Sequence, residues 1–479
     1  MNIKAPFDEA GVEYQQTRKA HWDSVAQKRE HWRGMGRWYH RRLMEVYKFL
    51  VNPNQRVLEI GCGMGELIAH LHPSRGVGVD FSPEMIARAK QLHPDIEFHQ
   101  LDAQDLSSLE GEFDVIIFSD TVNDIWDVQG SLEQVRKFCT PHTRLIMNFY
   151  SHLWQFPLTL AQSLNLAAPM MSQNWLTPQD IDNMLRLAGF ESIRTSREIL
   201  WPLPLGGFAN RYLVKLWPFH NLALSNFVIA HPAPQPAPVW QPSVSVVIAA
   251  RNEAGNIKSI FERVPKMGSK TEIVFVEGHS RDNTYKTIAD EIPLHPSTPS
   301  LLLRQLGVGK ADAIRLGFEK ASGDILMILD ADLTVPPEDL PRFYDAIVSG
   351  KGEFINGVRL VYPMEKEAMR TLNFIGNKLF SLAFSWMLGQ PIKDTLCGTK
   401  VMWREDYEKI AANRSYFGDF DPFGDFDLIF GAAKLNRKIV DLPIRYRDRT
   451  YGTTNIARWT HGLLLLRMVA FAARRVKFV

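Results

Sequence analysis

The sequence is poor in cysteine and has no long uninterrupted apolar run. Its 479 residues include three cysteines, Cys62, Cys139 and Cys397, an odd and widely scattered set. They offer neither a disulfide framework nor the spacing of a zinc site, which indicates a reducing compartment. No stretch reaches the roughly 18 uncharged apolar residues of a spanning helix. The opening residues, MNIKAPFDEAG, lack the apolar core of a signal peptide. We therefore expect a cytoplasmic protein.

An excess of either charge is also missing. Lysine and arginine total 55 and aspartate and glutamate total 53, so the formal net charge is +2. This balance gives no overall field that would attract nucleic acid, and we expect no nucleic-acid partner. Apolar residues make up 45% and charged residues 23% of the chain, which is typical of globular protein with sizeable cores. The length is long for one domain and suits two.

Proline is concentrated in HPAPQPAPVWQP, residues 231–242, which holds five prolines. Proline fixes φ and removes a backbone donor, so this stretch predicts an extended linker, neither helix nor central strand. On each side of it, apolar strands alternate with amphipathic segments. That order predicts two doubly wound α/β domains, residues 1–230 and 243–479, each with a largely parallel sheet covered by helices. The two halves carry different motifs, and no internal repeat is visible.

The first half contains VLEIGCGMGELIAHL, residues 57–71, in which an apolar strand runs into Gly61, Gly63 and Gly65. Glycines here permit a tight turn and let a ligand approach the backbone closely. A dinucleotide fingerprint would need a further glycine where Glu66 stands, which argues against NAD. The alternative is a glycine turn in a sheet that binds no cofactor.

Carboxylates follow the next two predicted strands. Asp80 ends the strand GVGVD, where it can accept hydrogen bonds from two ribose hydroxyls, and LDAQDL offers Asp102 and Asp105 near an adenine edge. Together with the glycine turn and the strand FDVIIFSD, they resemble class I S-adenosylmethionine-dependent methyltransferases over about residues 40–200. The resemblance implies a Rossmann-like domain with S-adenosylmethionine (SAM) as cofactor. The cofactor-binding residues that it implies are Glu59, Gly61, Gly63, Gly65, Asp80 and Asp102.

The acceptor side of this domain is predicted at SDTVNDIWD, after the fourth strand. Asp120 is the candidate catalytic base, and the alternative is a capped helix start with solvated acids. A base is optional, because methyl transfer depends mostly on alignment. Residues 21–43 interleave aromatic residues with arginines. They form either a lid that grips an anionic acceptor or an amphipathic helix that packs its aromatics on the domain, and we favour the helix.

In the second half, the buried strand ILMIL leads into Asp330 and Asp332. An i, i+2 pair at a strand end places both carboxylates at one mouth of the sheet. Two like charges this close repel each other unless a cation neutralises them. A divalent ion with oxygen ligands suits the pair, since such ions usually bridge substrate phosphates. The sequence therefore predicts Mg²⁺ or Mn²⁺ at Asp330 and Asp332.

Five motifs in order resemble family 2 glycosyltransferases of the GT-A fold over about residues 243–460. Glu277-Gly278-His279-Ser280 stands where that family usually has Asp-Asp-Gly-Ser, and FGDFDL offers Asp425 first and Asp427 second as general base. The segment DTLCGTKVMWRED, residues 394–406, resembles the acceptor side of polyprenyl-phosphate sugar transferases. YRDRTYGTTN resembles their closing basic loop, with Thr454-Asn455 in place of Ser-Lys. The nucleotide-sugar contacts implied are Arg251, Glu253, Glu277, Lys310, Asp330 and Arg447 or Arg449.

The two resemblances together imply a bifunctional enzyme. One half would transfer a sugar, with inversion and a metal, from a nucleotide-diphosphate sugar to a glycan or polyprenyl-phosphate acceptor. The other would methylate the glycan or glycolipid of the same pathway. A lipid phosphate needs no base, so Asp425 could instead hold the acceptor. The alternatives are that only one domain catalyses while the other is a scaffold, or that the methyl acceptor is an unrelated small molecule or protein.

The C-terminus, ARWTHGLLLLRMVAFAARRVKFV, has no acidic residue after Asp448. A basic helix that carries aromatic residues can lie in a membrane surface and hold to anionic lipid. We therefore expect peripheral contact with the inner membrane face. The alternative is a terminal helix that docks in a groove of its own domain.

Overall fold

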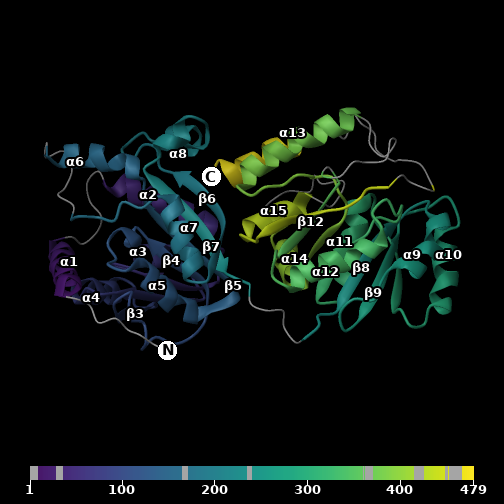
Figure 1. Ribbon diagram of the computed structural model, residues 1–479, viewed down its shortest axis with the longest axis horizontal. Coiled ribbons are helices and arrows are strands. Elements are labelled where there is room, and N and C mark those ends of the chain that lie inside the picture. The colour runs from purple at the N-terminus through teal and green to yellow at the C-terminus, as the bar shows by residue number, and fades with distance from the viewer. Residues whose placement is uncertain are drawn as a thin grey trace. The chain divides into compact units, whose positions relative to one another are not determined.

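The computed structural model describes residues 9–28, 36–163, 171–234, 240–359, 361, 371–414, 426–447, 451 and 466–479. Internal contacts divide the chain into two compact units, Met1–Ala233 with Phe478–Val479, and Pro234–Lys477. Each unit is built on one seven-stranded sheet (Figure 1).

The sheet of the first unit has the strand order β3-β2-β1-β4-β5-β7-β6. Strands β1 to β5 run parallel, whereas β7 lies antiparallel between β5 and β6. The carboxyl ends of the parallel strands meet at one edge, so the turns that follow them share that edge. The strands are β1 (Arg56–Ile60), β2 (Arg75–Asp80), β3 (Glu97–Gln100), β4 (Phe113–Ser119), β5 (Cys139–Tyr150), β6 (Phe190–Glu198) and β7 (Ser225–Pro232).

Alternate side chains of this sheet enter two different cores. Leu58 and Ile60 of β1 pack with α5 and α7, whereas Val57 packs with α2, α3 and α4. Helices therefore cover both faces, which confirms a doubly wound α/β unit. The helices are α1 (Glu9–Lys28), α2 (Gly36–Leu50), α3 (Glu66–His70), α4 (Pro83–Leu92), α5 (Val128–Val135), α6 (Gln155–Ser163), α7 (Pro178–Leu187) and α8 (Gly207–Arg211).

The sheet of the second unit has the order β10-β9-β8-β11-β13-β12-β14. Strands β8 to β11 are parallel, and β13 runs antiparallel between β11 and β12. The strands are β8 (Val244–Ala250), β9 (Thr271–Glu277), β10 (Ser300–Arg304), β11 (Ile325–Ile328), β12 (Phe354–Val358), β13 (Lys400–Trp403) and β14 (Ile439–Pro443).

Helices cover both faces of this sheet as well. Val246 and Ile248 of β8 pack with α9, α10 and α12. On the opposite face α11 lies so close that a Cβ on Gly317 would be 2.3 Å from Cγ1 of Val247. The helices are α9 (Ile257–Arg263), α10 (Thr284–Glu291), α11 (Lys310–Lys320), α12 (Leu340–Val348), α13 (Thr371–Leu388), α14 (Arg404–Ala412) and α15 (Phe426–Lys434).

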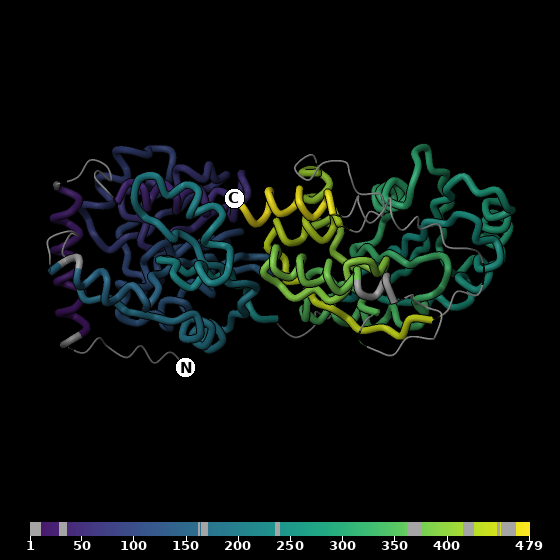
Figure 2. The backbone as a smooth tube through the Cα atoms, turned by 90° about the horizontal axis from the view of Figure 1, so that it is seen from above, coloured from purple at the N-terminus to yellow at the C-terminus, as the bar shows by residue number. Residues whose placement is uncertain are grey.

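The end of the chain is helical, as the sequence predicts. Residues 466–472 form an α-helix that continues into the π-helical η10 (Ala473–Lys477), beside α13 (Figures 1 and 2). Met468, Ala472 and Val476 are buried, whereas Arg467 and Arg474 are exposed. This is the burial pattern of a helix that docks on its own unit with its arginines in solvent. Among the helices that the described residues form, none is both long and apolar enough to cross a bilayer.

The structure refines the predicted start of the linker. Strand β7 runs to Pro232, two residues into the stretch predicted as linker, and Pro232 pairs with Phe190. A proline can close a strand because only its terminal donor is lost, and the next donor, Ala233 N–H, bonds the Gly189 carbonyl. Residues 235–239 lie outside the described part of the chain.

Within the segment that interleaves aromatics and arginines, α2 is the amphipathic helix that we favoured. It buries Tyr39, Leu43, Val46, Tyr47 and Leu50, whose spacing defines one helical face. Arg37 and Arg41 are exposed on the other side, whereas Arg42 flanks the buried face and lies 3.7 Å from Glu198. Residues 29–35 of the same segment are outside the described residues.

Candidate active sites

The glycine turn after β1 has positive φ angles, which glycine adopts more readily than other residues. Gly61, Gly63 and Gly65 have φ of 71°, 53° and 77°. A Cβ on Gly61 would lie 2.4 Å from the Thr121 side chain, and one on Gly65 would lie 2.5 Å from Phe98. A Cβ on Gly63 would meet nothing within 4 Å. The outer two glycines are thus required by packing, whereas Gly63 faces open space, where a ligand can approach the backbone. This cradle fits the cofactor that the sequence predicts.

Asp80 lies directly against this turn. Its carboxylate accepts the N–H of Gly63 and the N–H of Ser82, each at 2.9 Å. Burial raises the pKa of Asp80 to about 6, although these two backbone bonds act in the opposite direction. A carboxylate has about four acceptor sites, so capacity is left for a ribose hydroxyl. The predicted contact therefore stays compatible with the geometry.

Glu59 supports the turn from inside the unit. It is buried, and its Oε2 accepts the N–H of Ile68 in α3 at 3.1 Å. Burial raises the pKa of Glu59 to about 8. A side chain in this position holds the helix that follows the glycines, so its effect on a cofactor would be through the turn.

Asp102 is held by helix α1, whose contact with this site was not predicted from the sequence. Its Oδ2 accepts the Gln15 amide of α1 at 2.7 Å, and its Oδ1 accepts the backbone N–H of Gln104 at 2.8 Å. Asp23 of α1 likewise bonds the hydroxyl of Ser82. Helix α1 therefore crosses the turns that follow β2 and β3, and neither contact has a signal in local sequence, because the partners are distant along the chain.

Asp120 is the centre of a polar cluster at the end of β4. Its Oδ1 accepts the Tyr39 hydroxyl at 2.8 Å and the Asn148 amide at 2.5 Å. The Tyr39 oxygen also lies 3.0 Å from the Ser225 hydroxyl. Burial raises the pKa of Asp120 to about 7, against the bonds from Tyr39 and Asn148, which lower it. Its side chain makes no capping bond to the short helix η1 (Thr121–Asn123) that it precedes. A carboxylate with a pKa near neutrality can exchange protons at physiological pH.

In the second unit, Asp330 lies just beyond β11 and pairs with the first residue of α11. The Lys310 ammonium is 2.6 Å from Oδ1 of Asp330. Burial by itself would raise the pKa of Asp330, but the Lys310 ammonium, aided by Arg359 and Lys400, holds that pKa below its usual value. Asp330 is therefore an anion at neutral pH in a locally cationic setting.

Asp332 turns its Oδ1 to Thr334, accepting the backbone N–H at 3.1 Å and the hydroxyl at 2.7 Å. Within the described ranges, no group of three or more histidine, cysteine, aspartate or glutamate side chains is placed to hold a metal ion. Two carboxylates nevertheless fit Mg²⁺ or Mn²⁺, because such ions take most of their other ligands from water and substrate phosphates.

The predicted acceptor-side segment lies against this carboxylate. A Cβ on Gly398 would be 2.1 Å from Oδ2 of Asp330, so only glycine fits there. The same segment begins at Asp394, which accepts two bonds from the Arg359 guanidinium at 2.7 and 2.9 Å and one from Asn377 at 2.7 Å. Lys400 is fully buried a few residues further on. The sequence motif contains Asp394, but Arg359, which directly follows β12, lies outside every motif that the sequence offers.

The residues predicted on the nucleoside side mostly organise loops. Glu277 accepts the backbone N–H of Ser280 at 2.5 Å, and Glu253 accepts the Asn256 amide at 2.7 Å. Both glutamates are buried, whereas Arg251 is exposed. Their roles toward a nucleotide sugar stay predictions.

Asp427, the second choice as base, is buried in α15 between two guanidinium groups. Arg315 lies 3.0 Å and Arg414 3.8 Å from its Oδ2. Arg447 is exposed and lines a pocket of about 410 Å³ together with Arg342, Arg445, Glu338 and Asp339. The predicted residues Asp425, Arg449 and Thr454-Asn455 lie outside the described part of the chain.

Comparisons with known families divide the chain as its motifs do. Residues 51–189 match the family model described as a methyltransferase domain, and residues 245–411 match the one described as glycosyl transferase family 2. Undecaprenyl-phosphate 4-deoxy-4-formamido-L-arabinose transferase from Proteus mirabilis is 33% identical over 215 residues, 44% of this chain and 61% of that protein. Dolichol-phosphate mannosyltransferase from Pyrococcus furiosus is 35% identical over 109 residues, 22% of this chain and 30% of that protein. The chain thus spans 30% and 61% of the lengths of these two relatives.

Solved structures similar to part of the chain include two methyltransferases. A SAM-dependent methyltransferase from Thermotoga maritima has 17% identity and a TM-score of 0.33, and the match covers 41% of this chain and 90% of that one. Magnesium protoporphyrin IX methyltransferase from Synechocystis, with bound SAM, has 16% identity and a TM-score of 0.32, covering 48% of this chain and 100% of that one.

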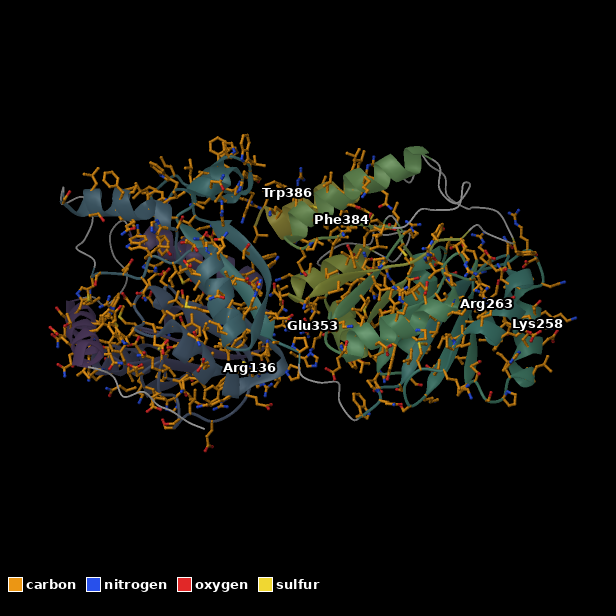
Figure 3. All side chains as sticks on the ribbon, in the orientation of Figure 1. Arg136, Lys258, Arg263, Glu353, Phe384 and Trp386 are labelled. Carbon is orange, nitrogen blue, oxygen red and sulfur yellow. The ribbon has the colours of Figure 1, made fainter. Side chains whose placement is uncertain are left out.

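The buried pair between Arg359 and Asp394 generates a stability prediction. Arg359→Ala leaves Asp394 buried without its partner, and we expect a loss of about 3–5 kcal/mol in the free energy of unfolding of the second unit. Urea denaturation measures it. The matched control is Arg263→Ala on α9 (Figure 3), whose ion pair with Glu338 is partly exposed, with side chains 31% and 55% accessible. That control should lose less than about 1 kcal/mol. Equal losses in the two variants would contradict the prediction.

Proposed function

We propose that this chain, which carries a methyltransferase domain and a family 2 glycosyltransferase domain, is a bifunctional enzyme. It transfers a sugar from a nucleotide-diphosphate sugar to a polyprenyl-phosphate acceptor, and a methyl group from SAM to a glycan or glycolipid of the same pathway. The observation that most directly supports the sugar-transfer assignment is that Asp330 contacts both Lys310 and Gly398 of the acceptor-side segment.

The donor half of sugar transfer is assigned to the edge of the sheet after β11. A divalent ion, when bound, neutralises the charge that develops on the leaving diphosphate. Asp330 and Asp332 are the residues that would hold it. Lys310 keeps Asp330 ionised and places a second positive charge where the diphosphate departs.

The acceptor half is better suited to a lipid phosphate than to a sugar hydroxyl. A hydroxyl needs a general base. Asp427, the second choice for that role, is engaged by the guanidinium groups of Arg315 and Arg414. A phosphate is already an anion and needs no base. Arg447, beside Arg342 and Arg445, is the candidate for contact with it. Two relatives of the second unit, an undecaprenyl-phosphate and a dolichol-phosphate sugar transferase, favour the same class of acceptor.

A lipid-linked acceptor requires that the second unit reach a membrane surface, and we place that contact on α13. Leu379, Leu382 and Trp386 are exposed at i, i+3 and i+7, a spacing that places them on one side of the helix. Trp386 is labelled in Figure 3. Leu466 and Arg467 are exposed at the start of the helical C-terminus, whose π-helical end packs on α13. Apolar side chains beside an arginine suit the inner face of a membrane, which carries anionic lipid.

The methyltransferase half is assigned to the edge that follows β1, β2 and β4. The open backbone at Gly63, with Asp80 beside it, would hold the methyl donor. Asp120 is the base that would take the proton of a hydroxyl acceptor, and Tyr39 and Asn148 position it.

The sugar-transfer assignment is tested by ligand-induced thermal shifts. One of UDP-, GDP- or dTDP-sugars should raise the melting temperature of the wild-type protein when Mg²⁺ or Mn²⁺ is present, because binding to the native state stabilises it by mass action. Asp332→Ala should abolish that shift and sugar transfer to undecaprenyl phosphate, while the shift given by SAM persists. Asp290→Ala, an exposed aspartate on α10, is the control. A SAM shift lost in Asp332→Ala would contradict the independence of the two sites.

The reciprocal change is Asp80→Ala. Loss of a hydrogen bond from a charged group should weaken SAM binding by about 1–3 kcal/mol, roughly 5- to 150-fold in the dissociation constant. Isothermal titration calorimetry measures it, and the shift given by the nucleotide sugar should not change. Asp95→Ala, an exposed aspartate of the same unit, should bind SAM as the wild type does. An unaltered dissociation constant in Asp80→Ala would overturn the assignment of Asp80.

The role of Asp120 predicts a pH profile. A base acts only when ionised, so with a pKa of about 7 the rate of methyl transfer should fall tenfold per pH unit below pH 7 and level off above it. Tyr39→Phe removes a donor that stabilises the carboxylate, which raises the pKa of Asp120 and moves the inflection to higher pH. Initial rates measured across the pH range decide this, and an inflection that stays in place would argue against Asp120.

A further inference from the structure

The first unit exposes large apolar side chains that its methyl-transfer site does not use. Six of them define what we call the aromatic patch: Leu153, Phe156, Leu205, Phe208, Trp217 and Leu222. Leu205 is 97%, Trp217 79% and Phe156 75% exposed. Single exposed apolar residues are common on protein surfaces, but such a concentration within two segments marks an interaction site.

Hydrogen bonds hold the backbone beneath the patch in place. The Trp154 indole donates to the Leu222 carbonyl at 2.9 Å, which joins the start of α6 to η5 (Phe219–Leu222). Asn210 of α8 both donates to the carbonyl and accepts from the N–H of Trp201, each at 2.7 Å. Figure 1 shows α6 and α8 on the same side of the unit, with α2 near them. The apolar side chains are therefore held outward by an ordered scaffold.

The patch adjoins the predicted acceptor side. Helix α6 begins five residues after Tyr150, the last residue of β5. The Tyr150 ring centroid lies 5.9 Å from that of Tyr39, whose hydroxyl donates to Asp120. Helix α6, which carries part of the patch, thus follows directly in the chain from a strand that ends beside the Asp120 cluster.

The charges around the patch favour an anionic surface. Residues 151–163 and 199–223, which supply it, contain no aspartate or glutamate. Arg211 is exposed at the end of α8, and α2 adds exposed Arg37 and Arg41 one turn apart. Helix α2 lies beside α8, since Arg42 donates to the Asn210 carbonyl at 3.4 Å. Glu45 of α2 lies 3.7 Å from Arg41, so Arg37 and Arg211 are the cations here that carry the argument. Exposed tryptophan and phenylalanine beside arginine are typical of side chains that enter the interface of an anionic bilayer.

We propose that the aromatic patch docks the first unit on a lipid surface that contains anionic lipid, so that the methyl acceptor is a lipid-linked molecule presented there. The docking stands on the patch itself, and the identity of the acceptor rests on the proposed function. The contact is separate from that of α13, because it belongs to the other unit.

Vesicle flotation of the full-length protein tests the docking. Because α13 offers a second contact, all proteins carry Leu382→Ser and Trp386→Ser. The patch variant adds Phe156→Ser, Phe208→Ser and Trp217→Ser, changes that remove exposed side chains and should leave the melting temperature unchanged. On vesicles of phosphatidylcholine with phosphatidylglycerol, its affinity should fall at least about tenfold. The control adds Leu92→Ser and Leu187→Ser, exposed apolar residues of α4 and α7, and should bind as its parent does.

Each outcome bears on the inference. Binding that the patch variant loses and the control keeps, and that is stronger on anionic than on neutral vesicles, supports it. Equal binding by the patch variant and its parent overturns it. So does a parent that is dimeric in light scattering and becomes monomeric in the patch variant, since the patch would then join two copies. SAM binding, measured by calorimetry on the same proteins, reports separately on the proposed function: a parent that binds vesicles but not SAM keeps the docking and loses the assigned activity.

Discussion

The ion pair between Lys310 and Asp330 is the interaction on which the second unit's active edge depends. Burial would favour a protonated Asp330, and the ammonium 2.6 Å away reverses that preference. Gly398 can approach the carboxylate only because it lacks a side chain. Buried Lys400 also lowers the pKa of Asp330, so the carboxylate and the cations stabilise one another. Lys310 and Asp330 are both partly exposed, and Arg359 also lowers the pKa of Asp330, so several cations share in holding this carboxylate ionised.

The pKa values of the site carboxylates are shifted in opposite directions in the two units. In the first, burial raises the pKa values of Glu59, Asp80 and Asp120 to about 8, 6 and 7, and mainly neutral N–H and O–H groups donate to them. In the second, cations hold the pKa of Asp330 down. Carboxylates that are bonded mainly by neutral donors suit a sulfonium donor, which is itself positive. A cationic site suits a leaving diphosphate. The electrostatics thus separate the two proposed chemistries even though both lie at the carboxyl ends of parallel strands.

What the sequence predicts well is local. Gly61, Gly63 and Gly65 follow one strand, and Asp330 and Asp332 follow another, so alternation and strand ends were enough to find them. The contacts that shape the sites were not predictable in this way. Gln15 reaches Asp102 across 87 positions, Tyr39 reaches Asp120 across 81, and Arg315 reaches Asp427 across 112. Each is a polar contact set by tertiary packing, and no periodicity or spacing in the sequence predicts it. The same holds for the aromatic patch, because an apolar residue in a sequence looks the same whether its side chain is buried or exposed.

The proposals also bear on the order of the two reactions. A base with a pKa near 7 is useful when the methyl acceptor is a hydroxyl group. A lipid phosphate is already ionised at this pH and has no hydroxyl group that a base must activate. The acceptor would then be a sugar, and methylation would act on the sugar rather than on the bare lipid carrier. A soluble nucleotide sugar and a lipid-linked sugar both offer hydroxyls, but only the second explains an acid-free aromatic surface beside the acceptor side. Sugar transfer therefore precedes methyl transfer in this scheme.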